Sequence, residues 1–241
     1  MQDTRQYPVG IQDFEKIRKE GYVYVDKTAL LWRLVSSGCY YFLSRPRRFG
    51  KSLLLSTIAA YYQGKKELFQ GLALANQVRE WPEAHPVLYL DLSNKEYSEY
   101  ADLTERLERH LKRWEARYGI TDLARSVELR FEEVILQAHE STKRQVVILI
   151  DEYDKPLLDA AGDEALRERY RKTLHAVYSN LKACDRCIKF AMLTGVTKFS
   201  KVSIFSGLNN LKDISMYAEY ATLCGITGQE LDTYSVSVLT L

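Results

Sequence analysis

The sequence predicts an α/β fold in which a mostly parallel central sheet lies between layers of helices. Four apolar segments alternate with helical patterns along the chain, which favours parallel pairing through crossover helices. The segment 146–150 is apolar at all five positions, as expected of a central strand that is covered by helices on both faces. The other three predicted strands are 40–44, 86–92 and 188–193.

Helical patterns fill the intervals between the strands. Over residues 99–118, apolar side chains recur at spacings of three and four, and Gly119 follows, which predicts a helix that ends there. The charged residues of this helix alternate in sign and are interpreted as a solvated face. The other predicted helices are 28–35, 51–63, 127–138 and 166–181.

Length and composition agree with one α/β domain. The chain has 241 residues, of which 46% are hydrophobic and 27% charged, and it is long enough for a substantial core. The net charge of +2 is too near neutral to favour nucleic-acid or membrane partners. No apolar stretch approaches the ~18 residues of a membrane span. Because the four cysteines are scattered, we expect a cytoplasmic protein without disulfide bonds or a zinc site.

A loop with phosphate-binding features follows the first predicted strand. Residues 45–52 read Arg-Pro-Arg-Arg-Phe-Gly-Lys-Ser and open into a helix. Strand, tight loop and helix form the context of a P-loop, because backbone N–H groups and the helix dipole favour anionic oxygens. Lys51 would reach the β- and γ-phosphates, and the Ser52 hydroxyl would bind Mg²⁺. Arg45 replaces the first glycine of the usual motif, and an ordinary helix N-terminus is the alternative. The predicted nucleotide-binding residues are Arg47, Arg48, Phe49, Gly50, Lys51, Ser52 and Leu53.

Two adjacent carboxylates, Asp151 and Glu152, end the apolar strand 146–150. A buried charge must be paired or bind a metal, so these residues predict more than an acidic turn, which is the alternative. Asp151 fits a Walker B ligand of Mg²⁺, and Glu152 fits the base that orients and deprotonates the attacking water. With the upstream loop, the pair predicts nucleotide binding.

The order of the motifs predicts a class of P-loop NTPase. A strand lies between the P-loop strand and the Walker B strand along the chain, and a glutamate follows the Walker B aspartate. Both features predict a three-layer α/β/α fold of the additional-strand, catalytic-glutamate type. In that class the strand after Walker B brings its polar tip beside the γ-phosphate, which makes Thr194 a sensor candidate. A β-branched residue that only ends a strand is the alternative for Thr194.

Six short strings resemble the bacterial AAA-ATPase-like family, over roughly residues 7–232. They are Tyr22-Val-Tyr-Val-Asp-Lys-Thr28, Ser44–Ser52, Leu90-Asp-Leu-Ser93, Ile150-Asp-Glu-Tyr-Asp-Lys-Pro156, Leu193-Thr-Gly-Val-Thr-Lys198 and Phe205-Ser-Gly-Leu-Asn-Asn210. The resemblance implies an ATPase-like fold, accepts arginine at position 45, and suggests an adenine pocket built from residues 7–28. Members of the family commonly carry a C-terminal domain that resembles PD-(D/E)XK nucleases, and nothing after Asp232 resembles one.

ATP with Mg²⁺ is the expected ligand, since no guanine-specificity motif is present in the right order. We expect slow hydrolysis by the isolated chain, because an arginine finger is the one part of the site that is missing. Arg47 or Arg48 could supply it in cis, or a residue of a neighbouring subunit could supply it. A non-hydrolysing nucleotide-dependent switch or scaffold is the alternative. A nuclease is not expected, since the carboxylates and lysine of 152–155 have the wrong spacing and follow a Walker B strand.

The remaining predictions concern the partners of the loop arginines and the C-terminal segment of the chain. The loop arginines are expected to pair with nucleotide phosphates and with acidic neighbours such as Asp26 or Asp154. The alternative is an outward role toward a second subunit or a DNA backbone, although tight DNA binding is not expected. Thr227 and Glu230 form a capping-box pattern that opens a helix. We expect an ATPase-like domain over 1–232 and an atypical or truncated tail over 233–241, a short but complete protein being the alternative.

Overall fold

Five parallel strands form one central sheet in the computed structural model, which describes residues 6–122, 125–197, 204–205 and 210–239. The strand order is β2-β3-β4-β1-β5, and every pairing is parallel. The four predicted strands are confirmed to within two residues at each end, whereas the two-residue β5 has no apolar run that would predict it. The strands are β1 (Tyr40–Ser44), β2 (Val87–Asp91), β3 (Val146–Asp151), β4 (Ile188–Gly195) and β5 (Lys212–Asp213).

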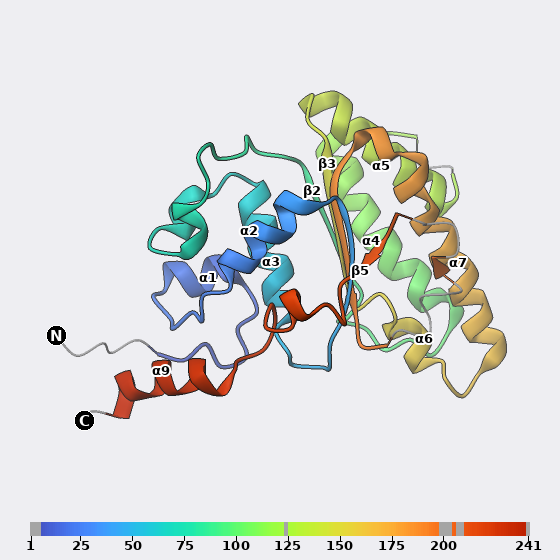
Figure 1. Ribbon diagram of the computed structural model, residues 1–241. Helices are drawn as coiled ribbons and strands as arrows, with labels where there is room; N and C mark the ends of the chain where they lie inside the picture. The colour runs from blue at the N-terminus through green and yellow to red at the C-terminus, as the bar shows by residue number, and fades with distance from the viewer. Residues whose placement is uncertain (1–5, 123–124, 198–203, 206–209, 240–241) are drawn as a thin grey trace.

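Helices cover both faces of the sheet, which Figure 1 shows nearly edge-on. One layer contains α1 (Phe14–Lys19), α2 (Thr28–Ser37) and α3 (Lys51–Tyr62). The other contains α4 (Tyr100–Tyr118), α5 (Val127–Thr142) and α7 (Glu164–Ala183). The predicted helices are therefore confirmed. The remaining elements are α6 (Lys155–Asp159), α9 (Gly228–Leu239) and the 3₁₀ turns η1 (Lys66–Phe69), η2 (Ala73–Asn76), η3 (Asp185–Cys187) and η4 (Ala218–Tyr220).

Strand β3 separates two hydrophobic cores. Val147 and Leu149 face the core beneath α1, α2 and α3, whereas Val146, Ile148 and Ile150 face the core beneath α4, α5 and α7. All five side chains are buried. Because successive residues of a strand point to opposite faces, burial on both sides requires the continuous apolar run.

Local signals fix the ends of α4. Its N-terminus carries a capping box in which the Glu99 side chain and the Asp102 side chain bond reciprocally to backbone groups. At its C-terminus Gly119 adopts φ 71°, a left-handed conformation that glycine reaches without a Cβ penalty. The predicted end at Gly119 is confirmed.

One charged residue of α4 departs from the solvated face that the sequence predicted. Glu115 is 2% exposed, and its carboxylate accepts two hydrogen bonds from the Arg130 guanidinium of α5, at 2.7 and 2.9 Å. The alternating charges gave no sign of this pairing, because its two partners lie on different helices. The ion pair joins α4 to α5 within the helix layer.

The capping box of the C-terminal helix is confirmed. The Glu230 carboxylate accepts from the Thr227 backbone N–H at 2.8 Å, and the Glu230 N–H donates to the Thr227 hydroxyl at 3.2 Å. The segment expected as an atypical tail is helical as far as Leu239. Figure 1 shows α9 beside the N-terminal segment, and the Tyr7 hydroxyl donates to the Tyr234 carbonyl at 3.2 Å.

Within the described ranges, no helix combines the length and apolarity that crossing a bilayer requires.

We predict that Arg130→Met lowers the free energy of unfolding by about 3–5 kcal/mol, because the buried Glu115 carboxylate loses its partner. Urea denaturation followed by far-UV circular dichroism measures the change. Arg125→Met is the matched control, since its exposed ion pairs with Asp122 and Glu133 contribute less than about 1 kcal/mol. Equal destabilisation by the two substitutions would contradict a structural role for the buried pair.

Candidate functional site

The loop 45–50 joins β1 to α3 in a conformation that aims the start of α3 at a cavity. Gly50 has φ 88° and is the N-cap of α3, where no side chain caps the first N–H groups. Arg48 also lies in the left-handed region, at φ 61°, which is strained for a residue with a Cβ. The uncapped N–H groups of a helix start are an anion-binding arrangement.

Lys51 lies beneath this loop. Its side chain is 3% exposed, and its ammonium donates to the carbonyls of Arg45 and Pro46, both at 3.1 Å. The lysine therefore holds the two ends of the loop together, and its ammonium lies beside the same cavity.

Arg45, the substitute for the first glycine of the motif, has a structural role. Its guanidinium donates to the carbonyls of Ser44, Ser215 and Tyr220, at 3.0, 2.7 and 3.2 Å. It is not among the cavity-lining residues. The arginine thus attaches the segment after β5 to the end of β1, and only Arg47 and Arg48 of the loop arginines reach the cavity.

The end of β3 places Asp151 between the neighbouring strands. Its carboxylate is 2% exposed and accepts from the Thr194 hydroxyl of β4 at 2.7 Å and the Tyr89 hydroxyl of β2 at 3.2 Å. Thr194 is fully buried and does not line the cavity. The hydroxyl that the sequence assigned to a γ-phosphate sensor is therefore directed at Asp151 in this structure.

Glu152 follows in a strained backbone conformation. It has φ 51°, and its side chain lines the cavity that Lys51 also lines. Burial raises the pKa of the Glu152 carboxyl, the negative charge of Asp151 raises it further, and the positive charges of Lys51 and Arg47 oppose the shift. A carboxylate with a raised pKa beside cations suits a general base.

The two acidic residues expected to pair with the loop arginines do not do so. Asp154 is fully buried and accepts from the backbone N–H groups of Val196 and Thr197. Asp26 accepts from the N–H groups of Thr28 and Ala73. Both carboxylates hold distant backbone segments instead, so the expected pairing is wrong for these two residues. Lys198 and residues 206–209, which belong to the family-like strings, lie outside the described residues.

A cavity of about 1130 Å³ connects the predicted residues. From the sequence-predicted set, Glu152 and Arg47 to Leu53 line it, whereas Asp151 and Thr194 lie buried behind it. Residues 7–12 and 23–25 also line it, which places the expected 7–28 segment beside the loop. Residues 223–226 and α9 also line the cavity, which the sequence did not predict; the capping box of α9 was the single available signal.

The C-terminal segment is attached to the cavity at two points. The Lys27 ammonium pairs with both Glu230 carboxylate oxygens, at 2.5 and 2.6 Å. Gly225 has φ 82° and lies so close to Phe49 that a Cβ there would meet the ring at 2.7 Å. A glycine is therefore required where this segment crosses the loop.

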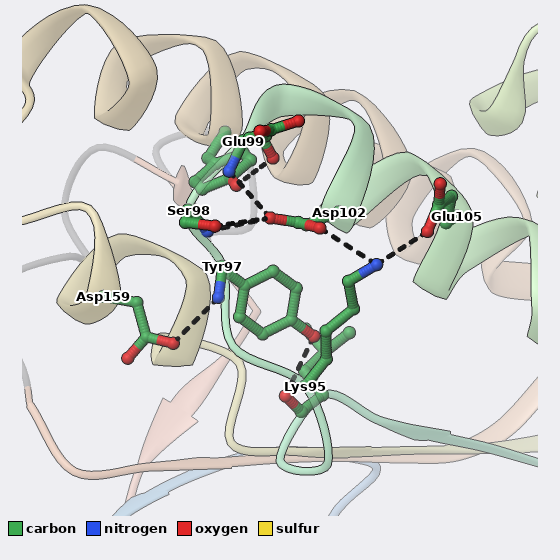
Figure 2. A network of polar contacts seen from close by, with 9 residues as sticks. Lys95, Tyr97, Ser98, Glu99, Asp102, Glu105 and Asp159 are labelled. Atoms are coloured by element: carbon green, nitrogen blue, oxygen red, sulfur yellow. Dashed lines mark hydrogen bonds and ion pairs between the residues drawn. The ribbon is translucent and has the colours of Figure 1, made fainter.

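A network of polar contacts holds the loop between β2 and α4, which carries Ser93 and Asn94 at the cavity (Figure 2). Lys95 bridges the carboxylates of Asp102 and Glu105, at 3.0 and 2.7 Å. The Tyr97 hydroxyl donates to the Leu92 carbonyl at 2.9 Å. The loop is thereby fixed to α4, and the bond from Tyr97 to Leu92 spans the loop itself just after β2.

We predict that Glu152→Gln raises the free energy of unfolding at pH 7. Folding raises the pKa of this carboxyl above its ordinary 4.5, so the folded protein binds the proton more readily than the unfolded chain does. At higher pH the ionised Glu152 therefore destabilises the folded state. The advantage of the variant should shrink as pH falls through the raised pKa and vanish below about 4.5. Urea denaturation at several pH values measures it. Glu20→Gln, which alters an exposed carboxylate, is the control, and a pH-independent difference would contradict the prediction.

Comparison with known proteins places the chain in a family. The family model described as "Predicted AAA-ATPase" matches residues 8–205, a narrower range than the expected 7–232. A protein of Azotobacter chroococcum mcd 1, described as an uncharacterized protein in the vnfD 5′ region, is 44% identical over 229 residues. That alignment covers 95% of this chain and 44% of the relative, so the chain spans less than half of the relative's length. No solved structure matches. With the family model covering most of its length, the chain belongs to the predicted AAA-ATPase family.

Proposed function

We propose that this chain binds ATP together with Mg²⁺ and hydrolyses the nucleotide slowly. The observation that carries the proposal is the cavity of about 1130 Å³, lined by the start of α3, the Lys51 side chain and Glu152. A helix N-terminus, a buried lysine and a carboxylate with a raised pKa form a constellation typical of phosphoryl transfer to water. Membership in the predicted AAA-ATPase family supports the same function.

The phosphate end of the nucleotide would lie on the loop. The N–H groups of residues 51–53 have no side-chain cap and would donate to phosphate oxygens. The Lys51 ammonium would exchange the carbonyls of Arg45 and Pro46 for phosphate oxygens, which are stronger acceptors because they are charged.

The donor set fits a magnesium ion held by Asp151 and Ser52. The Asp151 carboxylate is 2% exposed, and its described partners are two hydroxyls rather than a lysine or arginine. A buried carboxylate without a cation is an environment that a bound cation would complement. Magnesium accepts one or two protein oxygens together with phosphate and water ligands. When bound, it would neutralise charge on the β- and γ-phosphates. Among the described residues, no cluster of three His, Cys, Asp or Glu side chains forms a metal site by itself.

Glu152 would act as the general base. Its carboxylate would orient a water molecule and accept a proton from it as the water attacks the γ-phosphate. The left-handed backbone, with φ 51°, directs this side chain into the cavity while the preceding Asp151 side chain stays buried. Backbone strain at a proposed catalytic residue is consistent with such a role.

The sheet order supports the additional-strand type of P-loop fold. Strand β4 lies between β1, which leads into the loop, and β3, which ends at Asp151. Strand β2, which lies between them along the chain, occupies the edge instead. The carboxyl ends of β1, β3 and β4 therefore meet at one side of the sheet, where ligands of open α/β sheets bind.

Arg47 and Arg48 are the proposed sources of the remaining positive charge. Both line the cavity and are exposed, and neither has an ion pair with a described residue. They would approach the phosphates in cis or a nucleotide on a neighbouring subunit. Because no described residue fixes either arginine in place, we expect slow turnover by the isolated chain.

A nucleotide-dependent switch without hydrolysis is the second candidate. The observation that favours it is the attachment of α9 and residues 223–226 to the cavity through the Lys27–Glu230 ion pair and the Phe49–Gly225 contact. A nucleotide on the loop would alter the position of Phe49 and so act on the C-terminal segment. A phosphate-release assay on the purified chain separates the two candidates.

We predict that Lys51→Ala weakens ATP binding by at least about 30-fold, because removal of one partner of a buried charge-assisted contact costs about 2–5 kcal/mol. Isothermal titration calorimetry with MgATP measures the affinity. Lys66→Ala, which removes an exposed lysine outside the cavity, should bind as the wild type does. Equal affinity of wild type and Lys51→Ala would defeat the assignment of the loop.

We predict that Glu152→Gln keeps MgATP affinity within about threefold and loses at least 100-fold in turnover, since a general base contributes roughly 10²–10⁴. Release of inorganic phosphate under single-turnover conditions measures hydrolysis. Glu20→Gln is again the control. Turnover of Glu152→Gln at the wild-type rate would remove the water-activating role, and absence of turnover in the wild type would favour the switch.

A further inference from the structure

Strand β2 leaves one side of its backbone without a partner among the described residues. Hydrogen bonds from Val147 N to Pro86 O and from Leu92 N to Asp151 O show that the even-numbered residues of 86–92 pair with β3. Val87, Tyr89 and Asp91 therefore direct their N–H and C=O groups outward. Of these groups, the Asp91 carbonyl accepts from Arg106 Nε at 2.6 Å and lies 3.3 Å from His110 Nε2, and no described residue bonds to those of Val87 and Tyr89.

A groove of about 520 Å³ lies along this open edge. The same three outward residues of β2 form one wall, and one flank of α4 forms the other. The α4 residues in the groove are Arg106, Arg109, His110, Arg113 and Trp114.

The groove carries positive charge that the fold does not neutralise. Arg109 and Arg113 are exposed, and no described residue forms an ion pair with either. Arg106 differs, because Asp91 binds its guanidinium at 3.1 Å. Burial, with a smaller contribution from Arg106, lowers the pKa of His110 to about 4. His110 is therefore neutral at pH 7, and the arginines supply the charge.

We propose that this groove binds an extended acidic segment of a partner protein, which adds to the sheet as a strand beside β2. An extended peptide supplies alternating N–H donors and C=O acceptors, which match the outward groups of Val87 and Tyr89. Its carboxylates would pair with the guanidinium groups of Arg109 and Arg113. A nucleic-acid phosphate backbone offers acceptors only, so it would leave the strand carbonyls without donors. The proposal is independent of nucleotide hydrolysis.

The groove adjoins the nucleotide cavity. Asn94 lines both, and its side-chain amide donates to the Asp91 carboxylate at 2.7 Å. Tyr89 lines the groove while its hydroxyl donates to Asp151. A strand added at this edge would therefore contact a residue that positions the proposed magnesium ligand.

Binding of a designed peptide to the full chain tests the proposal. The probe is a fluorescein-labelled peptide of about a dozen residues that alternates glutamate with valine and threonine. Fluorescence anisotropy should show saturable binding without nucleotide. The double variant Arg109→Ala/Arg113→Ala should lose about tenfold or more in affinity. The control Lys112→Ala/Arg117→Ala removes two charges from the same helix outside the groove, and its affinity should stay within about twofold.

A second probe separates strand addition from attraction between charges alone. The same peptide with N-methyl groups on alternate backbone nitrogens keeps every carboxylate but loses the donors that would pair with β2, so it should bind at least about tenfold more weakly. Any one of four results would overturn the proposal: no saturable binding up to about 1 mM, equal loss in both double variants, equal binding of the methylated peptide, or tighter groove-dependent binding of oligothymidylate. Sedimentation velocity that shows a dimer displaced by Arg109→Ala/Arg113→Ala would instead assign the edge to a second copy.

Discussion

The site depends on how the fold accommodates the buried carboxylate of Asp151. Burial of a charged group is unfavourable unless hydrogen bonds or a cation compensate it. Here the compensation comes from both neighbouring strands, through the Thr194 hydroxyl of β4 and the Tyr89 hydroxyl of β2. Because both donors are neutral, they fix the carboxylate without cancelling its charge. The parallel order β2-β3-β4 is what makes this arrangement possible, since it brings all three carboxyl ends to one side.

Two residues that line the cavity have strained backbone. Arg48 and Glu152 adopt positive φ without being glycines, at 61° and 51°, and each costs of order 1 kcal/mol. The loop is stabilised by Lys51, which bonds to two of its carbonyls, and by Arg45, which holds the adjacent strand end. Arg45 explains how the loop forms without its first glycine: the side chain that replaces it is used as an anchor outside the cavity.

The sequence was sufficient for four strands, the major helices and the residues of the loop, because these features depend on local periodicity and on short motifs. It was insufficient where a role depends on tertiary contacts. Thr194 was correctly placed at a strand tip, but its hydroxyl bonds to Asp151. Glu115 belonged to an alternating charged helix, yet it is buried against Arg130 of another helix. The pairing of Asp26 and Asp154 with arginines was wrong, because backbone N–H groups far along the chain, those of Ala73 and Thr197, use the two carboxylates.

The net charge of the chain does not predict where its arginines lie. A net charge of +2 over the chain averages residues with unlike environments. Arg45 and Arg130 form hydrogen bonds that stabilise the fold. Arg47 and Arg48 line the cavity beside the loop. Arg109 and Arg113 line a second cavity, the groove beside β2. Asn94 lines both cavities, and its side-chain amide donates to the Asp91 carboxylate, which lines the second one. Tyr89 lines the second cavity, and its hydroxyl donates to Asp151, which lies buried behind the first. An occupant of the groove would therefore restrain a strand that holds Asp151, and a ligand that orders β2 lowers the entropic cost of ordering the Asp151 end of the site.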